Sequence, residues 1–118
     1  MRFYTERAFL FIYIFMKNNS VPKKELGVCL ISNKVAIDNE PVGFFYREQA
    51  EEELDSGWRF LSGNEDDDFL DNDDNYDVYD LEYIIEKDKN VKQYLHSAPG
   101  SAFERNPETE LFIPYKED

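Results

Sequence analysis

Short apolar runs separated by polar turns set the pattern of the first half of this chain. Residues 26–32 form a continuous apolar run with the length of a buried strand, and residues 35–37 continue it up to a turn at 38–41. Residues 42–48 and 58–61 are two further runs, rich in aromatic and β-branched side chains, and both predict strands. Alternation along residues 58–61 places Trp58 and Phe60 on one face and Arg59 on the other.

The hydrophobic spacing changes to a helical one after Asp80. This residue is a suitable helix N-cap, and apolar side chains recur at helical spacing on both sides of Asp88. The pattern predicts one helix with a break near Asp88, or two short helices, ending at 97–100. Residues 101–105 and 111–115 then predict a closing hairpin around 106–108.

Strands, then a helix, then strands indicate a single small α+β domain. We expect an antiparallel sheet with one broken helix on one face. The 118 residues suffice for one hydrophobic core, and ten Phe, eight Tyr and one Trp supply large buried areas.

Charge divides the chain into a basic beginning and a strongly acidic remainder. Residues 1–37 carry six basic and two acidic groups, whereas residues 38–118 carry seven basic and twenty-four acidic groups, which gives −13 in total. Such an excess disfavours binding to nucleic acid and to anionic membranes, because both are polyanions. It favours fast association with a basic protein partner, although acidity also serves solubility alone.

The first twenty residues are predicted to be an extension outside the domain at 21–118. Residues 8–16 are an apolar run that is too short to span a membrane. Three interpretations remain open for it: an export signal, an extra edge strand, or an upstream extension before a true start at Met16.

Cysteine and histidine usage favours a cytoplasmic protein that is not an enzyme. The single cysteine, Cys29, cannot form an internal disulfide and lies in an apolar run, so we expect a buried small hydrophobe. His96 is alone at a predicted helix end and suits an interaction with the helix C-terminus. No nucleophile motif, zinc pattern or phosphate-binding loop is present, and we expect no cofactor.

The densest chemical feature is an acidic segment that follows the strand at 58–61. It holds nine carboxylates within residues 65–80, and it is predicted to be a loop up to about Tyr79. Acids in an open loop attract a cation or a basic partner. Trp58 and Arg59 are placed either in the core or at an interface rim, and Arg47, Arg59 and Arg105 are read as ion pairs or as cations stacked on aromatic rings. The candidate partner-binding residues are Trp58, Arg59, Glu65, Asp66, Asp67, Asp71 and Asp74.

A calcium site is the alternative use of the acidic segment. Its oxygen-bearing side chains follow the spacing of a calcium loop, with Tyr76 at the place where the sharp turn favours glycine. This hypothesis makes the domain a calcium- or cation-responsive regulatory or adaptor domain. Its ligands are Asp71, Asp73, Asn75, Asp77 and Glu82, with Tyr79 at the ninth position.

Several blocks along the chain resemble a known bacterial family. They are PVGFFYRE at 41–48, DSGWRFLSG at 55–63, EDD at 65–67, YDL at 79–81 and GSAFER at 100–105, preceded by the strand at 29–32. Together they are similar to a bacterial domain of unknown function that is also classed as an immunity-protein-like domain, class thirty-three, of polymorphic toxin systems.

The resemblance implies a small cytoplasmic protein that binds and neutralises a cognate toxin. It implies no cofactor and no catalytic residues. Many toxins that act on nucleic acids have basic clefts, and the acidic segment is suited to occupy such a cleft.

Overall fold

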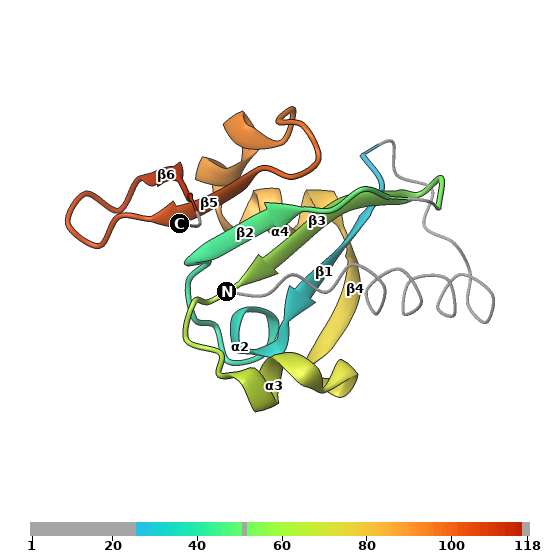
Figure 1. The fold of residues 1–118 in the computed structure, drawn as a ribbon, viewed down its shortest axis with the longest axis horizontal. Coiled ribbons are helices and arrows are strands. Elements are labelled where there is room, and N and C mark those ends of the chain that lie inside the picture. The colour runs from blue at the N-terminus through green and yellow to red at the C-terminus, as the bar shows by residue number, and fades with distance from the viewer. Residues whose placement is uncertain (1–25, 51, 117–118) are drawn as a thin grey trace.

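A six-stranded mixed sheet forms the centre of the computed structural model, which describes residues 26–50 and 52–116 (Figure 1). The strand order is β4-β1-β3-β2-β5-β6; β1 and β3 run parallel and the other neighbours run antiparallel. This agrees with the predicted α+β domain, and the parallel pair of β1 and β3 is a departure from the expected antiparallel sheet. The predicted extension at 1–20 lies outside the described residues. The strands are β1 (Val28–Ser32), β2 (Phe44–Arg47), β3 (Asp55–Leu61), β4 (Tyr76–Asp80), β5 (Ala102–Arg105) and β6 (Phe112–Pro114).

The predicted broken helix is α4 (Leu81–Lys87) followed by the 3-10 helix η2 (Lys89–Tyr94), which lie behind the sheet in Figure 1. Asp88 makes the break. Its N–H donates to the carbonyl of Ile84 at 2.8 Å and ends α4, while its carboxylate accepts from the N–H of Asn90 at 3.1 Å and begins η2. One residue therefore caps both helices.

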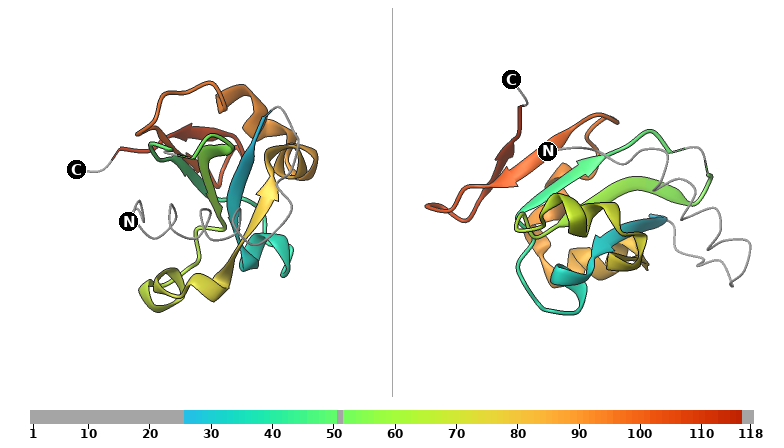
Figure 2. Two further views of the ribbon diagram at one scale, coloured as in Figure 1. Left: turned by 90° about the vertical axis from the view of Figure 1, so that its right-hand side faces the viewer. Right: turned by 60° about the horizontal axis from the view of Figure 1, so that its bottom comes forward.

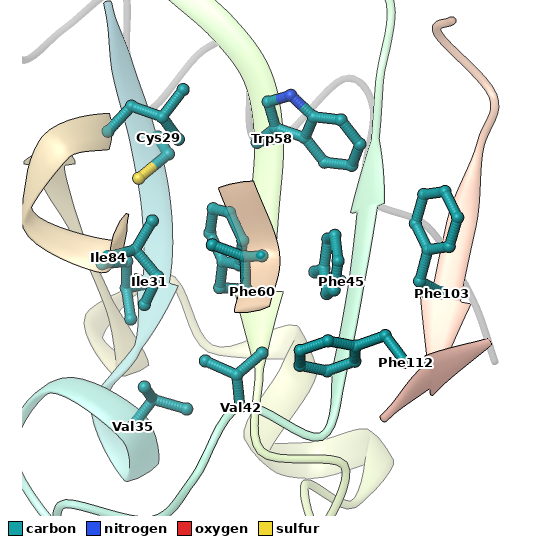
Figure 3. Close-up of a cluster of buried hydrophobic side chains, with 12 residues drawn as sticks. Cys29, Ile31, Val35, Val42, Phe45, Trp58, Phe60, Ile84, Phe103 and Phe112 are labelled. Carbon is teal, nitrogen blue, oxygen red and sulfur yellow. The ribbon is translucent and has the colours of Figure 1, made fainter. Parts of the chain in front are cut away.

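A row of phenylalanines crosses three strands on the face covered by α4 and η2 (Figure 3). Pairing places Phe45 of β2 opposite Phe60 of β3 and Phe103 of β5. The ring centroids of Phe45 lie 5.4 Å from Phe60 and 5.2 Å from Phe103, and Phe112 of β6 meets Phe45 edge-on at 4.9 Å. Such cross-strand aromatic pairs stabilise a sheet beyond the area that they bury.

The other face of the sheet carries a second, smaller apolar cluster. Alternation along β2 turns Phe44 and Tyr46 to this face, where they join Leu61, Leu70 and Ala102. The strands at the middle of the sheet therefore bury side chains on both faces.

The prediction that residues 35–37 continue the first strand is wrong. The strand β1 ends at Ser32, whose hydroxyl accepts a hydrogen bond from the N–H of Lys34 at 3.2 Å and starts the short helix α2 (Asn33–Ala36). A serine in this position offers the backbone a helical turn in place of further strand pairing. Val35 still reaches the core, whereas Ile37 beyond the helix is exposed.

The prediction that the acidic segment is a loop is also wrong. It contains the helix α3 (Asp67–Asp71), the 3-10 helix η1 (Asp73–Asn75) and all of β4, which pairs with β1 along its whole length. The left view of Figure 2 shows α3 below the ends of the strands. Asp80 does precede α4 as the sequence predicted, but its side chain makes no capping hydrogen bond.

We expect the substitution Phe45→Ala to lower the free energy of unfolding by about 3–5 kcal/mol, because it leaves a cavity at the centre of the aromatic row. Urea unfolding followed by circular dichroism measures this. The control is Ile113→Ala on the exposed side of β6, which we expect to change stability by less than about 0.5 kcal/mol. Equal effects for the two variants would show that the row does not organise the core.

Candidate functional site

Two of the predicted partner-binding residues lie inside the domain. Trp58 is 1% exposed and Arg59 is 3% exposed. The indole N–H of Trp58 donates to the carbonyl of Leu95 at 3.3 Å, which ties β3 to the end of η2. In this structure both side chains position the surrounding elements rather than forming an outer surface.

Arg59 forms a buried, two-pronged ion pair with Asp55. Its two terminal nitrogens each lie 2.9 Å from a carboxylate oxygen of Asp55, and Glu48 lies 3.7 Å from its Nε atom. Burial opposes the charged form, but the hydrogen bond and charge of Asp55 outweigh it and raise the pKa of Arg59. Asp55 also accepts the N–H of Gly57 at 2.8 Å, so the pair fixes the start of β3.

Arg47 and Arg105 also lie in the ion pairs or against the aromatic rings that the sequence predicted. Arg105 pairs with the carboxylate of Asp88 and lies 4.2 Å from the ring centroid of Phe112. Arg47 lies 5.6 Å from the ring of Trp58. Each of the three arginines is therefore placed in an ion pair or against an aromatic ring, as the sequence predicted.

Glu65 fastens the start of the acidic segment to the ends of two strands. One carboxylate oxygen accepts from the hydroxyls of Ser32 and Ser62, at 2.8 and 2.9 Å, and from the N–H of Ser62 at 2.8 Å. The other oxygen accepts from the N–H of Gly63 at 2.9 Å. These four bonds use the Glu65 carboxylate inside the protein, so its contribution is to hold the neighbouring acids in place.

Asp66 orders the residues that follow. Its carboxylate accepts from the N–H of Phe69 at 2.8 Å and caps α3. Asp67 and Asp68 in the first turn and Asp74 in η1 are exposed, and their carboxylates make no hydrogen bond or ion pair with the described residues. We call this region the acidic surface and define it as Asp66, Asp67, Asp68, Asp71, Asp73 and Asp74.

The predicted calcium ligands are not brought together. Asp71 ends α3, Asp73 and Asn75 lie in η1, Asp77 lies in β4, and Glu82 lies in α4. An extended strand advances about 3.3 Å per residue, which separates the last two positions. Within residues 26–50 and 52–116, no three His, Cys, Asp or Glu side chains are grouped so that they could hold a metal ion.

Cys29 is buried in the first strand, as its apolar neighbours predicted. Burial raises the pKa of its thiol far above the ordinary value, and the nearby charge of Arg59 offsets this only in part. A thiol held in its protonated form is a poor nucleophile.

The sequence analysis did not predict a cavity that lies at the end of the sheet opposite to the acidic surface. It lies where the start of β3 faces η2, and Arg47, Lys92 and His96 are among its lining residues. The residues that line it come from separate segments of the chain, so no local motif marks it. The one available signal was the position of Arg47 at the end of an aromatic strand.

Comparisons with known proteins give one family. The model of the family described as "Immunity protein Imm33 domain" matches residues 29–114. No curated protein and no solved structure matches the chain. In the part of the chain that the structure describes, no helix is long and apolar enough to cross a membrane.

We expect Asp55→Asn to lower the free energy of unfolding by about 3–5 kcal/mol, because it removes the charge of the two-pronged partner of the buried Arg59 and leaves Glu48 as the remaining carboxylate near it. Urea unfolding measures this, with Asp74→Asn as the control in which an exposed carboxylate is lost. A cost for Asp55→Asn no larger than that of the control would show that the pair does not hold the fold.

Proposed function

Since the chain belongs to the Imm33 immunity protein domain family, we propose that it binds a cognate toxin through the acidic surface and thereby neutralises it. The family match carries this proposal. It extends from the first strand to the last, so it includes the sheet and its helices rather than one short motif.

The acidic surface supplies the charge that suits a basic partner. Three of its carboxylates, those of Asp67, Asp68 and Asp74, have no hydrogen-bond or ion-pair partner among the described residues and are exposed. Lys34 lies beside this surface, with its Nζ 5.4 Å from the ring of Phe69 and donating to the carbonyl of Asn64. The exposed carboxylates of Asp67, Asp68 and Asp74 contribute a negative field, which speeds the approach of a basic protein.

The backbone that carries these carboxylates is held in place before a partner arrives. Glu65 fixes the segment to β1 and β3, and Asp66 fixes the first turn of α3. A pre-ordered surface loses less conformational entropy on binding than a flexible loop does. Arginine side chains of a toxin can then form paired hydrogen bonds with these carboxylates. Inhibition in this account is steric occlusion, without a chemical step.

The direct test of neutralisation is protection in cells. The full chain is co-expressed with the toxin encoded beside its gene, and growth is compared with cells that express the toxin alone. We expect growth to be restored and the two proteins to co-purify. Failure of both, with the chain expressed and folded, would reject the immunity function.

The test of the acidic surface is the triple variant Asp67→Asn/Asp68→Asn/Asp74→Asn. We expect its association rate with the toxin to fall about tenfold at low ionic strength and by less at high salt, because steering is lost. Stopped-flow or surface-based kinetics measures this rate.

The matched control for that variant is Glu86→Gln/Glu108→Gln/Glu110→Gln, which removes the same charge from exposed residues elsewhere. We expect its association rate to stay within about twofold of the unmodified protein. If the two triple variants behave alike, the toxin binds another surface, and the immunity function stands without the acidic surface.

A further inference from the structure

The cavity at the end of the sheet opposite to the acidic surface has a volume of about 370 Å³. The start of β3 forms one side of it, whereas Glu65 and α3 follow the other end of the same strand. The strand has seven residues, so its two ends lie six steps apart, or about 20 Å at the usual rise per residue. The cavity and the acidic surface are thus separate places on the molecule.

One wall of the cavity is apolar. The half-buried Ile85 of α4 and Leu95 after η2 line it, next to Leu81 and Trp58, which are almost fully buried. Trp58 and Leu81 are otherwise buried, so the cavity reaches the edge of the main core. An apolar group that enters here gains the free energy of leaving water.

The polar part of the cavity carries cations that lack a carboxylate partner. The Nε of Arg47 donates to the carbonyl of Ser56 at 3.0 Å and one terminal nitrogen donates to the carbonyl of Ser97 at 2.7 Å, so the guanidinium is fixed beside Trp58. A guanidinium has five N–H donors, which leaves some of them for a ligand. Neither Arg47 nor Lys92 forms an ion pair with the described residues.

The acids in the same cavity limit the charge that a ligand can have. Asp55 lines the cavity but is committed to Arg59, and Glu53 is exposed at the cavity. Two cations against one uncommitted carboxylate suit a single negative charge. A polyphosphate or another multiply charged anion would be repelled by Glu53 and by the charge of −13 on the whole chain.

We propose that this cavity binds an apolar monocarboxylate. The apolar body packs against Ile85 and Leu95 at the edge of Trp58, and the carboxylate accepts hydrogen bonds from Arg47 and lies near the charge of Lys92. The same chemistry is available from a small aromatic or aliphatic acid and from the C-terminal residue of a peptide that ends in an apolar side chain. This binding goes beyond the proposed toxin neutralisation and does not depend on it.

The probe for the test is 4-phenylbutyrate, and the readout is intrinsic fluorescence. Trp58 is the single tryptophan of the chain and lines the cavity, so its emission reports on the site directly. We expect a saturable change with 4-phenylbutyrate and at least about tenfold weaker binding of the uncharged 4-phenylbutanol, because the charge-assisted bonds are lost. No saturable change, or equal binding of acid and alcohol, would overturn the proposal.

A pair of variants ties the signal to the cavity. Lys92 and Lys89 are both exposed lysines of η2, and Lys92 lines the cavity whereas Lys89 does not. We expect Lys92→Glu to weaken binding of 4-phenylbutyrate at least about tenfold and Lys89→Glu to change it less than about twofold. The same loss in both variants would indicate a general effect of charge and would overturn the assignment to this cavity.

A short peptide with a C-terminal phenylalanine, as the free acid and as the amide, distinguishes the two sources of carboxylate. Competition by the free-acid peptide alone would assign a chain terminus as a ligand. Competition by neither peptide, together with binding of 4-phenylbutyrate, would assign a small acid. Equal competition by the acid and the amide would contradict a site that recognises the carboxylate.

Discussion

The aromatic row centred on Phe45 is the interaction on which the rest of this domain depends. Phe45 contacts rings from β3, β5 and β6 and from η2, so one side chain links the middle of the sheet, its closing hairpin and the helix that covers it. Figure 3 shows the rings of Phe60, Phe45, Phe103 and Phe112 close to one another. Since interiors pack at crystal-like density, the position of each strand follows from the fit of these rings. The acidic surface and the cavity beside Arg47 lie at opposite ends of that fixed sheet.

A buried ion pair adds a polar constraint to this apolar one. Arg59 and Asp55 lie four residues apart on the same face of β3, and Asp55 also accepts the N–H of Gly57 in the same strand, so the contact fixes the start of β3. A buried pair of this kind gives little net stability against a well-packed apolar pair, but the loss of one partner is costly. The constraint specifies how the start of β3 is placed. That placement also positions Arg47, because its Nε donates to the carbonyl of Ser56 in the same strand.

Local patterns in the sequence were sufficient to predict most helices and strands. They were insufficient where pairing between distant segments decides whether a strand forms. The apolar runs predicted β1, β2, β3 and the hairpin, and the spacing around Asp88 predicted the broken helix, because these signals are local. The strand β4 was not predicted because it lies among the nine carboxylates of residues 65–80, although Tyr76 and Val78 flank Asp77 in an alternating pattern. This strand exists because it pairs with β1, more than forty positions earlier.

The candidate sites show the same division. The acidic surface could be predicted because charge density is visible in the sequence. The internal role of Glu65 could not be predicted, because two of its partners are the hydroxyl of Ser32, from a distant strand, and that of Ser62. Trp58 and Arg59 were left between core and interface, since alternation assigns a face of the strand and not what covers that face. The cavity beside Arg47 could not be predicted, because the residues that line it come together only in the folded chain.

Several backbone groups at the two edges of the sheet are already bonded or cannot donate. At one edge, Pro114 has no N–H to offer, and the carbonyl of Phe112 already accepts the hydroxyl of Tyr94 at 3.0 Å. At the other edge, the N–H of Val78 is bonded to the carboxylate of Asp77, and the N–H of Tyr76 is bonded within η1. A strand from another protein would find few free donors at either edge. Pairing with a further strand is thus limited at these positions, whereas the acidic surface presents its charge on a backbone that Glu65 and Asp66 already hold.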